Sequence, residues 1–129
     1  MEEKVRKTVE SYFRLVNEER FDEFFALFDP EVEFKAPFNF VAQGLEKVKP
    51  FYLRVPVDYP HHVDSPEVIL VSGNRAAVFI DFVGTSKEGV RVAFKATDWF
   101  RVEDGKIKSL NIFYDSHYLA RVGSGKKKA

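Results

Sequence analysis

The chain has few of the residues that redox and soft-metal chemistry most often use. Its 129 residues include no cysteine, one methionine and three histidines. Disulfide bonds, thiol nucleophiles and cysteine-ligated metal sites are therefore excluded. The histidines do not have the spacing of a metal site either. We expect a protein that uses neither a metal nor a cofactor.

The sequence also lacks an excess of charge of one sign and any long apolar run. Twenty basic residues balance twenty acidic ones, which gives no electrostatic reason to expect nucleic acid or a membrane surface as the main partner. The opening MEEKVRK has no apolar signal segment, and no later run is long enough to span a bilayer. We expect a soluble, cytoplasmic protein.

Apolar and aromatic residues are plentiful. Hydrophobic residues make up 45% of the chain, and phenylalanine alone contributes 14. A chain of this length buries roughly two-thirds of its unfolded surface, enough for one core and a cavity. We expect one domain over residues 1–122 and a flexible basic tail over residues 123–129.

The first half of the chain has helical periodicity. Apolar residues at helical spacing predict a helix over residues 3–18: Val5, Val9, Tyr12, Phe13 and Val16. A second helix is predicted over 22–28, ending before Pro30. A third follows Gly44 in LEKVKPFYL, where Pro50 leaves its limits open.

The second half alternates with period two, which predicts strands over 62–72, 75–85, 89–102 and 106–115. The connections are short, and Asp104-Gly105 is a strong hairpin signal. Strands joined this closely pair as antiparallel neighbours. The fold class is therefore α+β, with a curved antiparallel sheet wrapped around N-terminal helices and a cavity between them.

One carboxylate lies on the buried side of this pattern. In KATDWF, Asp98 alternates with Phe94, Ala96 and Phe100, so it faces the core if they do. A buried aspartate must find hydrogen-bond donors or take up a proton. Tyr12 lies on the apolar face of the first helix, and its hydroxyl needs a partner, for which Asp98 is the expected residue. The alternatives are a structural Asp98 bonded to backbone amides and a Tyr12 that only fills the core.

Four segments in order carry a family resemblance: SYFRLVNEERFDEFFALFDPEVEF, GLEKV, TDWFRVEDGKI and the closing FYD. Together they resemble the nuclear-transport-factor-2-like superfamily, in its SnoaL-like and ketosteroid-isomerase-like branch. The resemblance implies a cystatin-like cone with an internal pocket. It also implies a homodimer formed through the outer sheet face, where Trp99 is expected.

The isomerase-like relatives imply an oxyanion hole. Tyr12 and Asp98 match the tyrosine and the aspartic acid that form it in that family. The general base of the family precedes a proline in a short extended segment, which here is FKAPF. Ala36 occupies the position of the base, so this role is not carried over.

Limonene-epoxide-hydrolase-like relatives imply a different pair, Asp81 and Asp115, although Phe79 replaces their arginine. SnoaL-like cyclases also have an aspartate near the final FYD, so Asp115 matches two branches; otherwise it caps a turn. Period two favours the outer sheet face for Asp81, paired with a basic residue such as Lys95.

The proposed catalytic residues are thus Asp98, Tyr12 and Asp115. The expected pocket-lining residues are Tyr114, Phe94, Phe100, Ile112, Phe38, Tyr52 and His62.

Two classes of function follow. The first is an acid-base enzyme on a small, mostly apolar molecule, of the isomerase, cyclase, dehydratase or epoxide hydrolase type. In it Asp115 or a histidine moves the proton. The second is a non-catalytic ligand-binding protein or dimeric scaffold, its pocket filled by phenylalanines such as Phe24, Phe28, Phe38, Phe40 and Phe51. Peptide recognition is a weaker third possibility.

Overall fold

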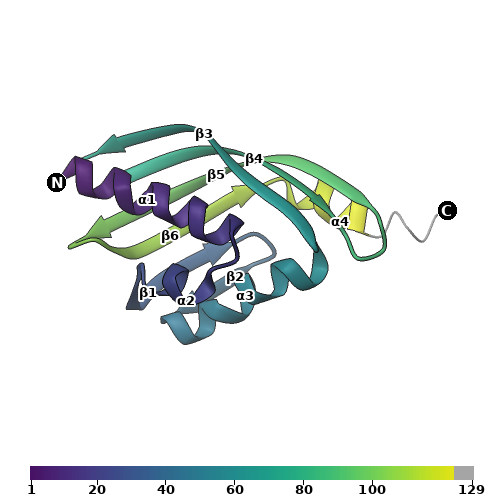
Figure 1. Ribbon diagram of the computed structural model, residues 1–129, viewed down its shortest axis with the longest axis horizontal. Helices are drawn as coiled ribbons and strands as arrows, with labels where there is room; N and C mark the ends of the chain where they lie inside the picture. The colour runs from purple at the N-terminus through teal and green to yellow at the C-terminus, as the bar shows by residue number, and fades with distance from the viewer. Residues whose placement is uncertain (124–129) are drawn as a thin grey trace.

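The computed structural model describes residues 1–123, which form helices packed on one curved sheet (Figure 1). The helices are α1 (Glu2–Asn17), α2 (Phe21–Phe25), α3 (Leu45–Asp58) and α4 (Ser116–Gly123). The strands are β1 (Phe28–Ala36), β2 (Phe40–Gln43), β3 (His61–Ser72), β4 (Arg75–Thr85), β5 (Arg91–Glu103) and β6 (Lys106–Tyr114). The predicted tail, apart from Gly123, lies outside the described residues.

The sheet has the order β2-β1-β6-β5-β4-β3. The four long C-terminal strands pair as antiparallel neighbours, as the short connections predicted. β1 joins β6 in parallel, so the sheet is mixed. The α+β class and the curved sheet are confirmed, while the short strand β2 was not predicted.

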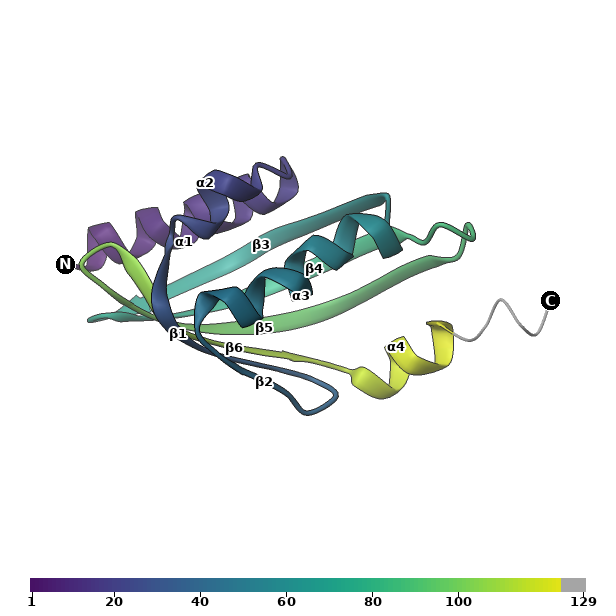
Figure 2. The same cartoon turned by 90° about the horizontal axis from the view of Figure 1, so that it is seen from below.

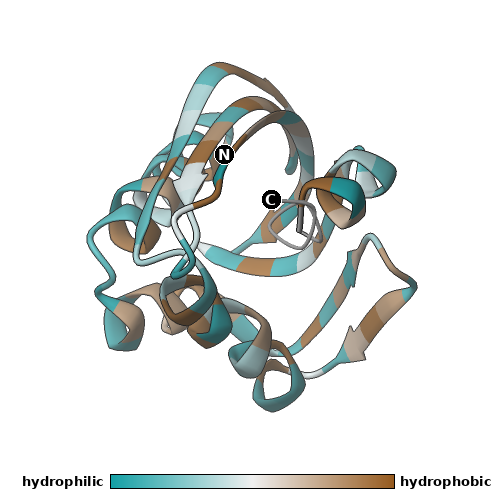
Figure 3. Cartoon of the chain, turned by 90° about the vertical axis from the view of Figure 1, so that its right-hand side faces the viewer, coloured by the Kyte–Doolittle hydropathy of each residue, from teal (hydrophilic) through white to brown (hydrophobic). Residues whose placement is uncertain are grey.

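The helices lie on the concave face of this sheet. Seen from below, α1 and α3 lie on the same side of the long strands, and α4 extends beyond the end of β6 (Figure 2). Seen from the end of the molecule, the strands form an arch, and apolar and polar bands alternate along them (Figure 3). This alternation is the period-two pattern of the sequence, with the apolar side turned inward.

α1 forms where helical spacing predicted it. Its buried face includes Val5, Val9, Tyr12, Phe13 and Val16, and Glu2 and Glu3 favour the positive end of the helix dipole. α2 is shorter than predicted, because Phe28 already pairs with Ile107 in the sheet.

Prolines occur where the structure tolerates them. Pro66 lies in the edge strand β3, next to an irregularity in the pairing with β4, a position where a missing N–H costs little. α3 continues through Pro50 and Pro56 to Asp58, further than the sequence indicated. The Asp104-Gly105 turn has positive φ at both residues, 54° and 73°, as a two-residue hairpin of this kind requires.

None of the helices within residues 1–123 is both long and apolar enough to cross a membrane.

Candidate functional site

A cavity of about 130 Å³ lies between the concave face of the sheet and the helices. Its walls come from α1, α3, α4 and the four long strands. Most of the lining is apolar or aromatic: Val16, Phe51, Val55, Tyr59, Ile80, Phe82, Phe94, Ala96, Ile112, Tyr114 and Leu119. The lining also includes two carboxyl groups, Asp64 and Asp98, and the tyrosines Tyr12 and Tyr52.

The strand register explains why space is left here. Across the sheet, Ile80 pairs with Ala96, and Ala96 pairs with Tyr114. All three face the cavity. On β5 the small Ala96 lies between Phe94 and Asp98 on the same face, because inward residues recur every second position. A larger side chain at residue 96 would occupy the cavity.

Asp98 lies in this cavity with its side chain buried, at 3% exposure. Among residues 1–123, no hydrogen bond or ion pair reaches its carboxyl group, so the alternative of an Asp98 bonded to backbone amides is not what the structure shows. Burial raises the pKa of Asp98 well above its ordinary value, and the nearby Asp64 carboxylate raises it further. The neutral acid, which can donate a hydrogen bond, is therefore the favoured form.

Asp64, which is not among the residues predicted from the sequence, is a second carboxyl group in the same cavity. Asn17, at the end of α1, makes two hydrogen bonds with the backbone of Asp64. Asn17 Nδ2 donates to the Asp64 carbonyl oxygen at 2.7 Å, and the Asp64 N–H donates to Asn17 Oδ1 at 2.8 Å. No side-chain partner of Asp64 is present in the described part of the chain. Burial raises its pKa to about 6, an effect that nearby His62 partly offsets.

A signal for Asp64 was present in the sequence. His62 was expected at the pocket, and period two places Asp64, two residues later on the same strand, on the same face. In the segment HHVDSPE, period two therefore places Asp64 on the inner face. The proline and the charged residues of this segment make the alternation of apolar and polar residues hard to recognise.

Two tyrosines form a hydrogen-bonded pair beside these acids. The Tyr12 and Tyr52 hydroxyl oxygens are 2.6 Å apart. The prediction that the Tyr12 hydroxyl bonds Asp98 is therefore wrong. One hydroxyl donates and the other accepts, so the accepting hydroxyl keeps a proton that it can donate to a ligand. Burial raises the pKa of both tyrosines well above the ordinary value, so both stay neutral.

Four of the seven expected lining residues line the cavity: Tyr114, Phe94, Ile112 and Tyr52. Phe100 does not, because its ring packs in the core against Tyr12, with ring centroids 5.0 Å apart. Phe38 is 61% exposed in the turn between β1 and β2, where its φ is +68°. The His62 side chain is 2% exposed and bonds Glu19 at 2.9 Å instead of lining the cavity.

Asp115 does not lie with the other two proposed catalytic residues. Asp115 is exposed and does not line the cavity. Its Oδ1 accepts a hydrogen bond of 2.9 Å from the Tyr118 N–H, in the first turn of α4. It therefore caps the helix, which was the alternative reading of its position.

Asp81 lies on the outer face, where Lys95 Nζ contacts its Oδ1 at 2.6 Å. The hydrogen bond from Lys95 lowers the pKa of Asp81. The outer-face alternative for this residue is the one that the structure shows, and the epoxide-hydrolase-like pair is absent from the cavity.

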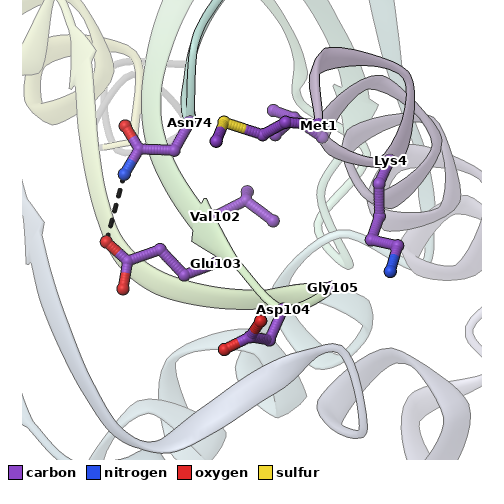
Figure 4. A pocket seen from close by; sticks show the side chains of 8 residues that line it. Met1, Lys4, Asn74, Val102, Glu103, Asp104 and Gly105 are labelled. Atoms are coloured by element: carbon purple, nitrogen blue, oxygen red, sulfur yellow. Dashed lines mark hydrogen bonds between the residues drawn. The ribbon is translucent and has the colours of Figure 1, made fainter.

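A second, larger hollow of about 550 Å³ lies on the surface, where the start of α1 meets two hairpin turns (Figure 4). One of its carboxylates is bonded within the protein: Asn74 Nδ2 donates to Glu103 at 3.1 Å, and Arg101 pairs with the same carboxylate at 2.9 Å. No buried carboxyl or hydroxyl group faces this hollow within the described chain. The inner cavity is the better candidate site.

Within residues 1–123, no group of three or more His, Asp or Glu side chains is arranged to hold a metal ion. The chemistry available in the cavity is hydrogen bonding and proton transfer by two carboxyl groups and a tyrosine pair.

A curved mixed sheet packed against helices, with a cavity between them, is the architecture of the nuclear-transport-factor-2-like fold. The sequence matches the SnoaL-like domain family over residues 9–110. The chain belongs to this family.

Solved structures support the fold. A protein of unknown function with this fold from Burkholderia pseudomallei has a TM-score of 0.85 at 19% identity, over 92% of this chain and 96% of its own. A proposed SnoaL-like polyketide cyclase from Jannaschia has 0.86 at 17% identity, over 94% and 92%. A proposed ketosteroid isomerase from Kribbella flavida has 0.74 at 22%, over 88% and 79%.

At these identities the likeness establishes the fold alone. No functionally curated protein matches the sequence.

Proposed function

We propose that the protein is an acid-base enzyme that acts on a small, mostly apolar molecule carrying a carbonyl or similar oxygen. The observation that carries this proposal is Asp98, a buried carboxyl group that faces an apolar cavity and has no partner among residues 1–123. Such a group is costly to keep, and a ligand oxygen would supply the partner that the described chain does not.

The mechanism follows from the donors. A neutral Asp98 donates its O–H, and the tyrosine pair donates the proton that is not shared between Tyr12 and Tyr52. Both donors are preorganised in a site of low polarity. They would therefore stabilise negative charge that develops on a ligand oxygen more strongly than water does.

The cavity size limits the ligand. Its volume of about 130 Å³ is close to that of an engineered apolar cavity of about 150 Å³ that accepts benzene. A molecule built on one six-membered ring fits this volume, and aromatic walls such as Phe82 and Phe94 suit its flat faces.

The non-catalytic alternative is a protein that only binds such a molecule. A scaffold with a pocket filled by phenylalanine is not favoured, because Phe24 and Phe28 pack in the core while the space beside Asp98 stays open. An enzyme and a protein that only binds the ligand would use the same hydrogen-bond donors. The first experiment therefore tests these donors.

Titration with substituted phenols, whose phenolate oxygen imitates an oxyanion, tests the donors. We expect affinity for 4-nitrophenolate to fall about 10- to 100-fold in Asp98→Leu and in Tyr12→Phe, the loss of one hydrogen bond to a charged group. Asp98→Asn keeps a weaker N–H donor and should lie between wild type and Asp98→Leu. Ultraviolet difference spectra follow the binding.

Asp81→Asn is the matched control, because this aspartate lies on the outer face of the sheet. The affinity of Asp81→Asn for 4-nitrophenolate should equal that of wild type. Unchanged affinity in both Asp98→Leu and Tyr12→Phe would rule out the proposed oxyanion site.

A further inference from the structure

The cavity holds one carboxyl group more than an oxyanion site requires. Asp98 and the tyrosine pair suffice to bind a ligand oxygen, yet Asp64 also faces the cavity. No described side chain accepts or donates a hydrogen bond at its carboxyl group. A carboxyl group kept in an apolar space without a partner needs an explanation.

We propose that Asp64 is the proton acceptor of this site and removes a proton from the carbon next to the carbonyl group that Asp98 binds. This inference rests on the proposed function, since it takes Asp98 as the residue that holds the ligand oxygen.

The strand register supports this division of roles. Asp64 pairs with Phe82 on β4, and Asp98 pairs with Val78 on the same strand. Ile80 lies between these two rows and faces the cavity together with its partner Ala96. A ring-sized ligand over Ile80 and Ala96 would therefore have one carboxyl group on each side.

The surroundings of Asp64 suit a base. Neighbours that carry or can acquire charge approach it from several elements: His62 on its own strand, Asp98 from β5, Tyr12 from α1 and Tyr52 from α3. His62 is engaged with Glu19 at 2.9 Å, and no cation contacts Asp64 within residues 1–123. With a pKa of about 6, Asp64 is mostly ionised at neutral pH, close to the optimum for a general base.

Two carboxyl groups with different pKa values divide the work of acid and base. The ionised Asp64 takes the proton as the C–H bond breaks and an O–H bond forms on its carboxylate. The electron pair of the C–H bond becomes the C=C bond of an enolate, and the π pair of the carbonyl group moves to its oxygen, which Asp98 and the tyrosine pair hold. Returning the proton to the same or a conjugated carbon completes exchange or isomerisation, and no other reactant is consumed.

Proton exchange of a simple ketone tests the inference. Cyclohexanone in D₂O is followed by proton NMR, which reports the replacement of its α-protons by deuterium. We expect wild type to accelerate the exchange and Asp64→Asn to lower the rate at least about 100-fold, while 4-nitrophenolate binds Asp64→Asn as well as or better than wild type. Asp81→Asn should exchange at the wild-type rate.

The pH profile identifies the acceptor. The wild-type exchange rate should rise as the pH increases through about 6 and level off above it, because only the ionised carboxylate accepts a proton. The ¹³C shift of the Asp64 carboxyl group in the wild-type protein should titrate over the same range, which requires no variant to fold.

Failure of the role of Asp64 and failure of the proposed function give different results. Exchange in Asp64→Asn at the wild-type rate, or no acceleration by wild type over buffer, overturns the role of Asp64 even when phenolate binding depends on Asp98. Phenolate binding that ignores Asp98 and Tyr12 overturns the proposed function instead.

Discussion

At the scale of single residues, two carboxyl groups face the cavity, the buried Asp98 and the half-buried Asp64. Asp98 and Asp64 both have raised pKa values because burial penalises their charged forms. Replacing them with apolar or neutral residues should make the fold more stable. Their presence is therefore better explained by function than by folding.

The stability effect of Asp64 depends on pH. In the unfolded chain its pKa is near 4, and in the folded chain it is about 6, so the folded state binds more protons between these values. The free energy of unfolding therefore falls as the pH rises from about 4 to 6, and levels off above. Asp64→Asn should match wild type at pH 4 and exceed it by on the order of 1–3 kcal/mol at pH 7, as urea denaturation at each pH would show.

Asp81 supplies a control of opposite sign. Lys95 lowers its pKa, so its contribution to stability is present above the unfolded pKa and disappears as the pH falls below it. Asp81→Asn should be no more stable than wild type at pH 7. A pH-independent difference between wild type and Asp64→Asn would contradict the raised pKa.

At the scale of elements, α4 closes one end of the cavity. Leu119 from this helix lines the cavity, and Tyr118 holds the helix to β5 by accepting a hydrogen bond from the Ala93 N–H at 3.1 Å. The helix begins after Asp115, whose side chain caps it. The same residue that two related families suggested as catalytic thus has a structural task.

This assignment of Asp115 is open to a direct test. Asparagine caps a helix about as well as aspartate, so Asp115→Asn should retain stability within about 0.5 kcal/mol and keep wild-type ketone exchange and phenolate binding. Asp115→Ala should lose about 1 kcal/mol of stability. Loss of exchange in Asp115→Asn, with stability and binding unchanged, would return Asp115 to the catalytic group.

At the scale of the whole molecule, the outer face of the sheet has an apolar surface. Phe79 pairs with Thr97, and Thr97 pairs with Phe113, in one row across β4, β5 and β6. Trp99 follows in the next outward row at 52% exposure, and Phe113 is 51% exposed. Adjacent exposed aromatic side chains of this size are typical of a surface that another molecule covers.

We expect a homodimer in which this face packs on its counterpart by two-fold symmetry. Phe113→Glu should yield monomers in sedimentation velocity, and the fluorescence of the only tryptophan, Trp99, should shift to longer wavelength as its surroundings become wet. Leu53→Glu changes an exposed leucine on α3, away from the sheet face, and should leave both measurements unchanged. A monomeric wild-type protein at micromolar concentration would contradict the dimer.

Much of the architecture was determined by the sequence itself. Helical spacing defined α1, period two defined the four long strands, and the Asp104-Gly105 turn fixed one hairpin, because each of these signals acts over a few neighbouring residues. The same alternation placed Asp98 inward and favoured the outer face for Asp81. These local patterns cannot report pairing between distant segments, so the parallel contact between β1 and β6 and the short strand β2 were not foreseen.

The composition of the cavity was decided by tertiary structure. Tyr52 meets Tyr12 across 40 positions in the chain, and Asp64 joins Asp98 from another strand. Whether an inward residue lines a cavity or fills the core depends on which helix packs above it, and this separates Phe94 from Phe100 on the same strand. The sequence thus determined which side chains point inward. Helix packing on the curved sheet decided which of them share a space, and it leaves two carboxyl groups there without partners among residues 1–123.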